Sequence, residues 1–323
     1  MKAIVCTQYG PPDILQIKEV KKPVPADNEV LIRVCATTVN RTDCGMLRAS
    51  PFFARLFMGL FRPRNQILGC EFAGFIEAVG KEVSHFKIGD KVFGFSGKTF
   101  GAHAEYMTLS EDAALTIIPE GVSCEQAAAS TEGAHYAYNL IKNVQLQSGQ
   151  KVLVNGSTGA IGSAAVQILK HFGAEVTAVC DTKNLDLVKS LGADRVIDYT
   201  KEDFTKEDNK YSFIFDTYGK ASFTKCRRLL NPGGLFLTCD LGPMNQNIVF
   251  MLLKPFIGSK KVVLPMPDDP KGDLFFIRKL MVLGKFKAVI DRTYPLEKIV
   301  EAYRYVETGQ KTGSVVITVG GKA

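Results

Sequence analysis

The feature that most constrains the fold of this chain is a glycine-rich turn between an apolar stretch and an amphipathic one. The apolar stretch 151–155 is followed by Gly156, Gly159 and Gly162, and segment 161–172 then carries apolar residues at the spacing of one helical face. Glycine permits a tight turn and lets backbone N–H groups approach a pyrophosphate, which a helix N-terminus stabilises electrostatically. Because a predicted strand precedes the glycines and a helix follows them, the turn predicts dinucleotide binding. A tight turn without a ligand is the alternative.

The second half of the chain alternates short apolar stretches with helical patterns, which is typical of a doubly wound parallel sheet. Six strands suit a dinucleotide-binding Rossmann sheet, and they are predicted at 151–155, 175–180, 195–198, 212–216, 234–239 and 261–265. The first half instead holds short strand-like runs broken by Gly, Pro, Asn and Asp, which predicts a β-rich barrel.

Near the C-terminus a strand at 288–290, a helix that begins at Pro295 and a strand at 314–318 are expected to rejoin this barrel. The predicted fold is therefore α/β. Its domains are a first part of the barrel (1–120), the dinucleotide-binding domain (121–285) and the return to the barrel (286–323).

Composition places the chain among ordinary globular proteins. It has 323 residues, of which 46% are hydrophobic and 23% charged, enough for two domains. The net charge of +7 is spread along the chain, so no nucleic-acid partner is favoured. The N-terminus reads as a strand and not as a targeting segment, which predicts a cytoplasmic protein. The eight cysteines show no paired short spacing, so neither a disulfide framework nor a CxxC zinc site is expected, and most should be buried.

The tip of the second predicted strand of the sheet carries both an acid and a base, Asp181 and Lys183, on either side of Thr182. An acid there accepts hydrogen bonds from ribose hydroxyls and repels a 2′-phosphate, whereas a lysine pairs with that phosphate. Asp181 lies just past the strand and Lys183 is long enough to turn inward, so the pattern favours NADPH over NADH. The alternative for Lys183 is a solvated residue at the start of a helix.

Several segments resemble the medium-chain dehydrogenase/reductase superfamily, and within it the zinc-free quinone oxidoreductase (ζ-crystallin-like) branch, over essentially the whole chain. They are Asn40-Arg41-Thr42-Asp43, Gly69-Cys70-Glu71-Phe72-Ala73-Gly74, the glycine turn, the run from Leu191 to Tyr199, and Gly313-Ser314-Val315-Val316. The resemblance implies a GroES-like β-barrel substrate domain together with the Rossmann domain, and an oxidoreductase activity.

Zinc enzymes of this superfamily hold a catalytic metal with Cys, His and Cys, and the corresponding places here are Asn40, Cys70 and Thr131. Tetrahedral zinc needs at least three good nitrogen or sulfur ligands, which Cys70 alone does not supply. The lobe of four closely spaced cysteines that carries a structural zinc is also missing around 95–110. The resemblance therefore implies an enzyme without zinc.

The resemblance also indicates site residues. Asn40 is expected beside the nicotinamide, and Lys183 and Tyr199 at the adenosine 2′-phosphate. Tyr218 follows a predicted strand of the sheet and should lie near the cofactor, although a packing role is equally compatible with its position. Asn40 and Tyr218 are the catalytic candidates. The predicted cofactor-binding residues are Asn40, Thr131, Gly156, Ser157, Thr158, Gly159, Ala160, Ile161, Gly162, Asp181, Thr182, Lys183, Tyr199, Leu241 and Lys311. The predicted substrate pocket consists of Asp43, Phe52, Phe53, Cys70 and Phe95.

Without a metal to polarise a carbonyl, hydride delivery to an electron-poor acceptor is the easier task, so quinones and α,β-unsaturated ketones or aldehydes fit best. Segment 51–62 is unusually aromatic and carries basic residues at intervals. It is expected to wall an apolar substrate pocket, to lie on an anionic membrane surface, or to cover the barrel. With the apolar segment 250–257 it favours a lipophilic substrate.

Two other functions stay open at this point. One is an enoyl-thioester reductase, which turnover of acyl-CoA substrates would distinguish. The other is a weakly active relative that senses NADPH or binds RNA, which steeply salt-dependent RNA binding would favour. Relatives commonly form homodimers through the last strand of the cofactor sheet, and residues 260–264 are suited to pair as an edge strand.

Overall fold

The computed structural model describes residues 1–50, 55–242, 246–253, 258–265 and 268–320. The chain forms two compact units. The first consists of Met1–Glu132, Pro270–Val282 and Ala288–Ala323, and the second of Gly133–Asp269 and Leu283–Lys287. Among the described helices, none is both long enough and apolar enough to cross a membrane.

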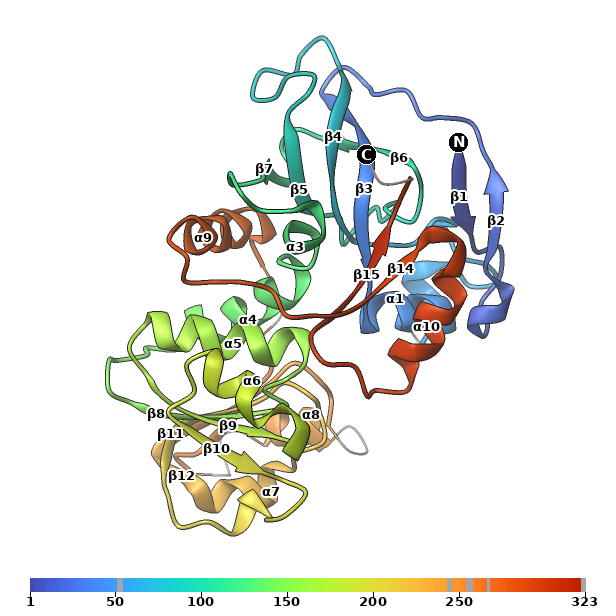
Figure 1. The fold of residues 1–323 in the computed structure, drawn as a ribbon. Coiled ribbons are helices and arrows are strands. Elements are labelled where there is room, and N and C mark those ends of the chain that lie inside the picture. The colour runs from blue at the N-terminus through green and yellow to red at the C-terminus, as the bar shows by residue number, and fades with distance from the viewer. Residues whose placement is uncertain (51–54, 243–245, 254–257, 266–267, 321–323) are drawn as a thin grey trace. The chain divides into compact units, whose positions relative to one another are not determined.

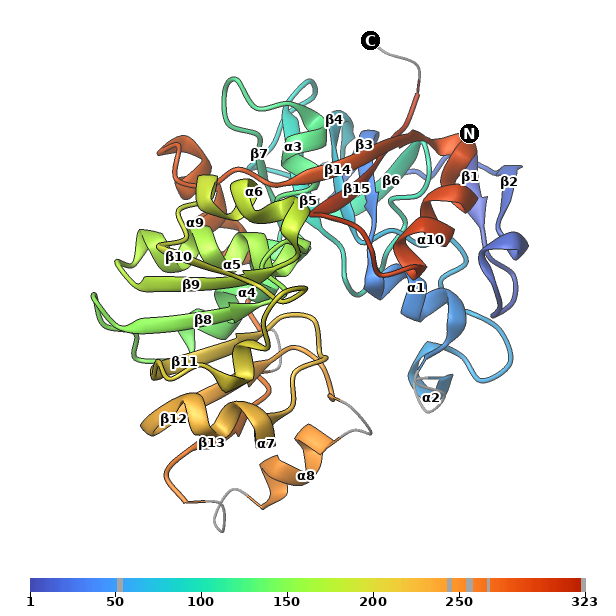
Figure 2. The ribbon, with the colours of Figure 1, turned by 60° about the horizontal axis from the view of Figure 1, so that its bottom comes forward.

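A six-stranded parallel sheet forms the centre of the second unit, and Figure 2 shows its strands side by side in the order β10-β9-β8-β11-β12-β13. Neighbouring strands all pair in parallel. The bounds are β8 (Lys151–Asn155), β9 (Glu175–Cys180), β10 (Arg195–Asp198), β11 (Tyr211–Asp216), β12 (Leu230–Thr238) and β13 (Lys261–Val263). This is the strand order of a doubly wound dinucleotide-binding sheet, so the predicted Rossmann sheet is confirmed.

The helices of the second unit connect and cover these strands. They are α4 (Glu132–Lys142), α5 (Ala160–His171), α6 (Leu185–Ser190), α7 (Phe223–Cys226) and α8 (Gln246–Leu252). Helix α5 contacts β8 and β9, and Ala165, Ile168 and Leu169 of the predicted apolar face are fully inaccessible. Phe172, the last residue of that predicted face, lies just beyond the helix and is exposed, so the prediction is wrong for this residue. It ends directly before Phe172 and Gly173, where Gly173 adopts a φ of +79°.

The first unit is built on a sheet in the order β14-β15-β3-β4-β5-β7, with β6 paired to β3 and a separate β1-β2 pair (Figure 1). Its strands are β1 (Lys2–Val5), β2 (Gln16–Glu19), β3 (Glu29–Val39), β4 (Glu71–Val79), β5 (Lys91–Phe95), β6 (Tyr106–Ser110), β7 (Ala114–Ile117), β14 (Ile290–Pro295) and β15 (Ser314–Thr318). The long strand β3 pairs antiparallel with β4, β6 and β15. The predicted β-rich architecture of the first half is confirmed.

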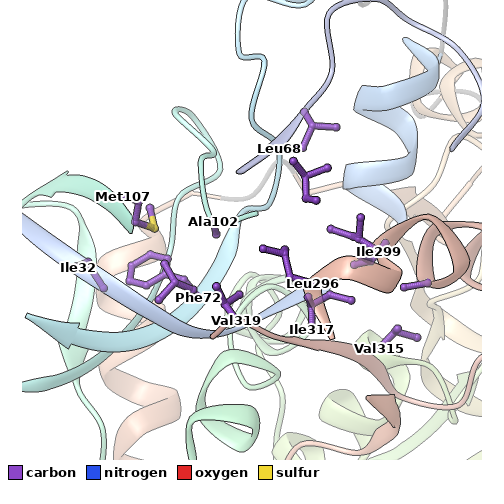
Figure 3. Close-up of a cluster of buried hydrophobic side chains, with 14 of the residues drawn as sticks. Ile32, Leu68, Phe72, Ala102, Met107, Leu296, Ile299, Val315, Ile317 and Val319 are labelled. Atoms are coloured by element: carbon purple, nitrogen blue, oxygen red, sulfur yellow. The ribbon is translucent and has the colours of Figure 1, made fainter. Parts of the chain in front are cut away.

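Apolar side chains from both ends of the chain share one core in this unit, as Figure 3 shows. Ile32 of β3 and Phe72 of β4 are buried with Ile299 of α10 and with Val315 and Ile317 of β15. The C-terminal segment therefore rejoins the first unit, as predicted. The helices of the unit are α1 (Arg41–Arg48), α2 (Arg55–Met58), α3 (Cys124–Ala128), α9 (Pro270–Val282) and α10 (Ile299–Glu307).

Some boundaries differ from those predicted. The strand expected at 288–290 is β14 at 290–295, and a 3-10 turn separates Pro295 from the start of α10 at Ile299. The units divide at other residues than 121 and 285. Helix α3 packs on β3 and β4, and α9 packs on β5 and β7, so both helices belong to the first unit and not to the second. Arg278 of α9 fixes that second contact, since its Nε donates to the carbonyl oxygen of Ile117 at 2.9 Å.

Cys35 of β3 and Cys124 of α3 form a disulfide, with their Cα atoms 6.4 Å apart. The expectation that the cysteines form no disulfide is wrong for this pair. The two residues are separated by 89 positions, and only the packing of α3 on β3 brings them together. The other six cysteines are free, and five of them are buried as expected.

Candidate functional site

The glycine turn lies between β8 and α5, and its three glycines differ in their backbone conformation and in the space around them. Gly156 has a φ of +77°, which favours glycine, and a Cβ on it would stand 2.9 Å from Cβ of Tyr218. A Cβ on Gly162 would lie 2.1 Å from the carbonyl oxygen of Gly156, so only glycine lets the helix approach the turn. A Cβ on Gly159 would meet no atom closer than 3.7 Å. Packing within the unit therefore explains Gly156 and Gly162 but not Gly159.

The N-terminus of α5 has the properties of an anion site. Gly159 is its N-cap residue and makes no side-chain capping bond to the first N–H groups of the 12-residue helix. The turn residues Thr158, Gly159, Ala160 and Ile161 are all partly exposed. Backbone N–H groups, the positive end of the helix dipole and the space left by the missing Cβ of Gly159 together fit a pyrophosphate.

Side chains behind the turn hold it in place. Ser157 Oγ donates to the carbonyl oxygen of Val179 in β9 at 2.9 Å, and Thr217 Oγ1 donates to that of Asn155 at 2.9 Å. Asn155 Nδ2 in turn donates to Oδ1 of Asp216 at 2.9 Å. Burial raises the pKa of Asp216 to about 6. The hydroxyl of Ser157 thus points into the unit, and this residue contributes to a cofactor site by positioning the turn.

Beyond β9 the structure places the predicted adenosine-binding residues together. Asp181 Oδ1 accepts a hydrogen bond from Nδ2 of Asn184 at 2.6 Å, and its Oδ2 lies 3.7 Å from Nζ of Lys183. The Lys183 side chain is 63% exposed and that of Asp181 23% exposed. Tyr199 is also exposed. The acid is thus held by a neighbouring amide, while the ammonium group of Lys183 stays accessible to an anion.

The remaining predicted residues of the second unit have distinct surroundings. Thr182 Oγ1 donates to Oδ2 of Asp198 at 2.5 Å, so its hydroxyl braces the tips of β9 and β10. Tyr218 is partly buried and packs against Gly156, directly beside the glycine turn. Leu241 lies three residues beyond the end of β12 and is partly buried. All three lie at carboxyl ends of sheet strands, where doubly wound sheets bind their ligands.

In the first unit, a cluster of buried polar side chains surrounds Glu71 at the start of β4. Its Oε2 accepts hydrogen bonds from Thr38 Oγ1 and from Asn40 Nδ2, the latter at 3.1 Å. Its Oε1 accepts from Thr131 Oγ1 at 2.7 Å and from the backbone N–H of Glu132 at 2.8 Å. Four donors thus stabilise a charge on this buried carboxylate. We call Glu71 and these four residues, together with Thr42 and Cys70, the polar cluster.

Asp43 positions Asn40 within this cluster. The two residues form a capping box at the start of α1, in which Asp43 N donates to Asn40 Oδ1 at 2.9 Å and Asn40 N donates to Asp43 Oδ2 at 3.1 Å. Gly69 N donates to the other carboxylate oxygen at 3.1 Å. Asn40 Nδ2 also donates to Sγ of Cys70 at 3.2 Å, and burial raises the pKa of that thiol well above its ordinary value. Asp43 is fully buried, so its contribution to a pocket is to orient Asn40.

Glu132 is the second buried carboxyl group of the cluster. Thr42 Oγ1 donates to its Oε1 at 2.5 Å. Burial, followed by the negative charge of Glu71, raises the pKa of Glu132 well above its ordinary value. Lys311 is the cation that acts on both carboxylates, and its Nζ donates to the carbonyl oxygen of Gly313 at 2.5 Å. Burial lowers the pKa of Lys311, while Glu71 and Glu132 oppose that effect.

The titration of Asp43 predicts a pH dependence of folding stability. Burial raises its pKa to about 8 in the folded protein, whereas an unfolded aspartate has a pKa of about 3.9. Between these values the unfolded chain releases a proton that the folded chain keeps, so the free energy of unfolding falls as the pH rises. Asp43→Asn removes this contribution. We expect the stability of the wild type relative to the variant to fall by a few kcal/mol between about pH 4 and pH 8, since each pKa unit is worth ~1.4 kcal/mol. Parallel pH curves in urea unfolding of the two proteins would contradict this.

The structure thus brings together four predicted residues of the first unit, namely Asn40, Asp43, Cys70 and Thr131. Phe95 pairs with Glu71 in the register of β5 and β4, so the two side chains leave the same face of the sheet. The predicted pocket residues Phe52 and Phe53 lie outside the described residues. The sequence reasoning missed Glu71 and Glu132 as site residues, although each directly follows a residue at a former zinc-ligand position, and that adjacency was the signal available.

The donors at these former ligand positions are poorly suited to zinc. Asn40, Cys70 and Thr131 supply an amide, a thiol and a hydroxyl, of which only the thiol is a good zinc ligand. The amide and the hydroxyl are moreover hydrogen-bonded to Glu71. Throughout the described part of the chain, no three His, Cys, Asp or Glu residues are grouped so that they could hold a metal ion.

Comparison with protein families matches three profiles to the chain. An alcohol dehydrogenase GroES-like domain covers residues 26–120, and a zinc-binding dehydrogenase profile covers residues 191–317. A glutamate/leucine/phenylalanine/valine dehydrogenase profile covers residues 121–213, which include the glycine turn. The expected GroES-like domain is therefore confirmed.

Individual relatives align over almost the whole chain. A 2-methylene-furan-3-one reductase of Solanum lycopersicum is 34% identical, over 98% of this chain and 79% of the relative. An NADPH-dependent alkenal/one oxidoreductase of Arabidopsis thaliana is 30% identical, again over 98% of this chain and 79% of the relative. Among solved structures, the quinone oxidoreductase from Coxiella burnetii superimposes with a TM-score of 0.86 at 27% identity, covering 99% of both chains.

Proposed function

We propose that this chain, which belongs to the medium-chain dehydrogenase/reductase superfamily and within it to the quinone oxidoreductase branch, is an NADPH-dependent reductase that works without zinc. Its acceptor is a quinone or an α,β-unsaturated ketone or aldehyde with a lipophilic body. The observation that carries this proposal is the polar cluster, in which Asn40 and Thr131 are hydrogen-bonded to Glu71 where zinc relatives hold a metal. A site without such a metal suits acceptors that are already electron-poor.

The glycine turn would hold the pyrophosphate of NADPH, through the N-terminus of α5 and the space beside Gly159. Lys183 and Tyr199 would contact the 2′-phosphate, and Tyr218 and Leu241 would lie along the cofactor. Asn40, Thr131 and Lys311 would be the contacts from the first unit. The bound cofactor supplies a hydride; the protein residues bind it, orient the acceptor and control the proton.

The relatives support the choice of acceptor. Their names specify a methylene-furanone, alkenals or alkenones, and quinones. These compounds share a carbon–carbon double bond conjugated to a carbonyl group, which accepts a hydride without a Lewis acid. The lipophilic body rests on the apolar segment around α2 of the first unit, where Leu56 and Phe61 are largely exposed. Side chains of this kind, unpaired on a surface, are suited to an apolar ligand.

A panel of acceptors tests this proposal. Purified protein is mixed with NADPH and, separately, with a para-quinone, a long-chain 2-alkenal, a ring-bearing enone, a small polar enone and an enoyl-CoA, and the loss of NADPH absorbance is followed. We expect the lipophilic quinone and enones to give the highest kcat/KM. Faster turnover of the small polar enone would contradict the lipophilic body, and preference for the enoyl-CoA would favour a thioester reductase instead.

The second unit also offers a surface for a homodimer. Strand β13 lies at the end of the six-stranded sheet order, with β12 as its neighbour. An edge strand presents unpaired backbone groups, which a second copy can satisfy across a two-fold axis. We therefore expect a dimer through β13.

A further inference from the structure

Helix α8 of the second unit turns apolar side chains outward. Its Asn247 is fully buried, with Nδ2 donating to the carbonyl oxygen of Asp240 at 3.0 Å, and Phe250 packs against Phe223 of α7 with ring centroids 5.1 Å apart. These two residues lie three positions apart, so together they fix the side of the helix that faces the unit. The exposed side chains are all apolar, and Leu252 is the most exposed of them at 75%. We call them the apolar face of α8, namely Ile248, Val249, Met251, Leu252 and the following Leu253.

Folding of the second unit does not account for the apolar face. Single exposed apolar residues are ordinary, whereas a contiguous group of them on one surface marks a place of interaction. Asn247 and Phe250 already hold α8 on the unit from its other side. The apolar face therefore indicates a partner.

Helix α7 lies beside α8 (Figure 2) and borders a hollow of about 630 Å³. Three basic residues, two hydroxyl residues and one acid line the hollow, namely Lys206, Lys225, Arg228, Thr205, Thr224 and Asp203. Arg228 is held in place there, since its Nη1 donates to the carbonyl oxygens of Thr205 and Glu207 at 2.8 and 3.0 Å. Three cations against one acid favour an anionic group. We call these six lining residues the basic hollow.

The charge around the two features has the same sign. Asp208 offsets part of the charge of Arg228, with its Oδ1 3.5 Å from Nη2. Within 217–263, however, the described residues include one acid, Asp240, and six basic residues, namely Lys220, Lys225, Arg227, Arg228, Lys260 and Lys261. The expectation that the positive charge is spread along the chain is therefore wrong for this segment.

The apolar face and the basic hollow are neighbours through α7, because Phe223 contacts α8 while Lys225 lines the hollow. An anionic lipid bilayer matches both features, since it offers phosphate groups to the cations and acyl chains to the apolar side chains. A second copy of the chain would bring the same basic residues against each other across a two-fold axis, which like charges oppose. Single-stranded RNA would match the charge but leave the aliphatic side chains without a partner.

We propose that the second unit docks on an anionic lipid bilayer, with the apolar face of α8 among the acyl chains and the basic hollow at the lipid headgroups. This inference goes beyond the proposed function and does not depend on it, because docking requires neither cofactor nor turnover. For a reductase of lipophilic acceptors, docking gives access to substrates that are dissolved in the bilayer.

A fluorescent probe tests the insertion of α8. The chain has no tryptophan, so a single introduced one reports its surroundings without background. Leu252→Trp places the probe on the apolar face, and Leu283→Trp places it at another exposed leucine of the same unit. On addition of vesicles of equal parts phosphatidylcholine and phosphatidylglycerol, we expect the emission of Leu252→Trp to shift to the blue and to be quenched by brominated acyl chains. The emission of Leu283→Trp should not change. Unshifted and unquenched emission of Leu252→Trp would overturn the proposal.

Cosedimentation with the same vesicles separates the two contributions. Leu252→Gln removes the most exposed apolar side chain, and we expect it to weaken binding roughly tenfold. The double variant Lys206→Ala, Lys225→Ala removes two exposed cations and leaves Arg228 in place. Each basic residue at an anionic surface contributes about fivefold to binding, so this variant should bind at least about tenfold more weakly. Wild-type binding should fall as the salt concentration rises and should be weak on phosphatidylcholine alone.

Matched controls come from exposed residues of the same unit. They are Leu283→Gln for the apolar change and the double variant Lys189→Ala, Lys201→Ala for the change of charge. We expect both controls to bind the mixed vesicles within about threefold of the wild type, because neither alters the apolar face or the basic hollow. Equal binding by the wild type and Leu252→Gln would show that the apolar face does not insert.

Other occupants of this surface give different results. A wild type that ignores the vesicles, together with a dimer that Leu252→Gln converts to a monomer in analytical ultracentrifugation, would show a contact between copies and overturn the proposal. RNA binding that depends steeply on salt and is lost in Lys206→Ala, Lys225→Ala, without any binding to vesicles, would overturn it in favour of a nucleic acid.

Discussion

Replacing Gly159 with valine is expected to abolish NADPH binding while the cofactor-free protein stays folded. A Cβ at this position would meet no protein atom within 3.7 Å, and the backbone has an ordinary extended conformation with φ of −69°. The added side chain would instead fill the space before the first turn of α5, where the pyrophosphate is expected. We predict a loss of affinity of at least about a hundredfold, or ~2.7 kcal/mol, measured by calorimetric titration.

Gly162→Val is the informative comparison. A Cβ there would lie 2.1 Å from the carbonyl oxygen of Gly156, so the turn and the helix must separate. We expect this variant to lose both NADPH binding and thermal stability, whereas the apparent Tm of Gly159→Val without cofactor should stay within a few degrees of the wild type. An unchanged Kd for NADPH in Gly159→Val would show that the turn does not hold the cofactor.

Removing Lys183 is expected to weaken NADPH binding selectively. Its ammonium group is exposed, and a charge-assisted bond to a 2′-phosphate contributes about 1.5–3 kcal/mol. Lys183→Ala should therefore raise the Kd for NADPH roughly tenfold to a hundredfold and change the Kd for NADH little. The neighbouring carboxylate of Asp181 opposes a phosphate, so Asp181→Ala should strengthen NADPH binding.

The control for this experiment is Lys201→Ala. Lys201 is another exposed lysine at the same end of the sheet, with its Nζ 3.5 Å from Oδ2 of Asp198. Its removal changes the net charge as the removal of Lys183 does, and we expect a smaller effect. Equal losses of NADPH and NADH affinity in Lys183→Ala would mean that Lys183 does not bind the 2′-phosphate.

The sheet of the second unit could be predicted strand by strand because its signals are local. Parallel strands buried on both faces read as continuous apolar runs, and β8, β9 and β10 have the predicted bounds. The glycine turn and the face of α5 are equally local patterns. The last strand but one was predicted at 288–290, from a short apolar run, whereas β14 spans 290–295. Ile290 is the one residue that the run and the strand share. Most other residues of β14 are polar, so they show no apolar pattern that predicts a strand.

Features that depend on tertiary contacts could not be predicted in the same way. The disulfide joins residues 89 positions apart. The importance of Glu71 and Glu132 arises because β4, α1 and the segment after α3 meet, which places their carboxyl groups among shared donors. A charged residue in a sequence is normally solvated, and nothing local indicates that these two are buried.

The most direct test of the account uses protein purified in the presence of a chelator and checked by elemental analysis. NADPH oxidation is then measured with a lipophilic enone, before and after zinc is added, and the saturated product is quantified. We predict that less than about 0.1 equivalent of zinc accompanies full activity, since Asn40, Cys70 and Thr131 do not form a zinc ligand set. One equivalent of tightly bound zinc, with activity that disappears when it is removed, would contradict the account.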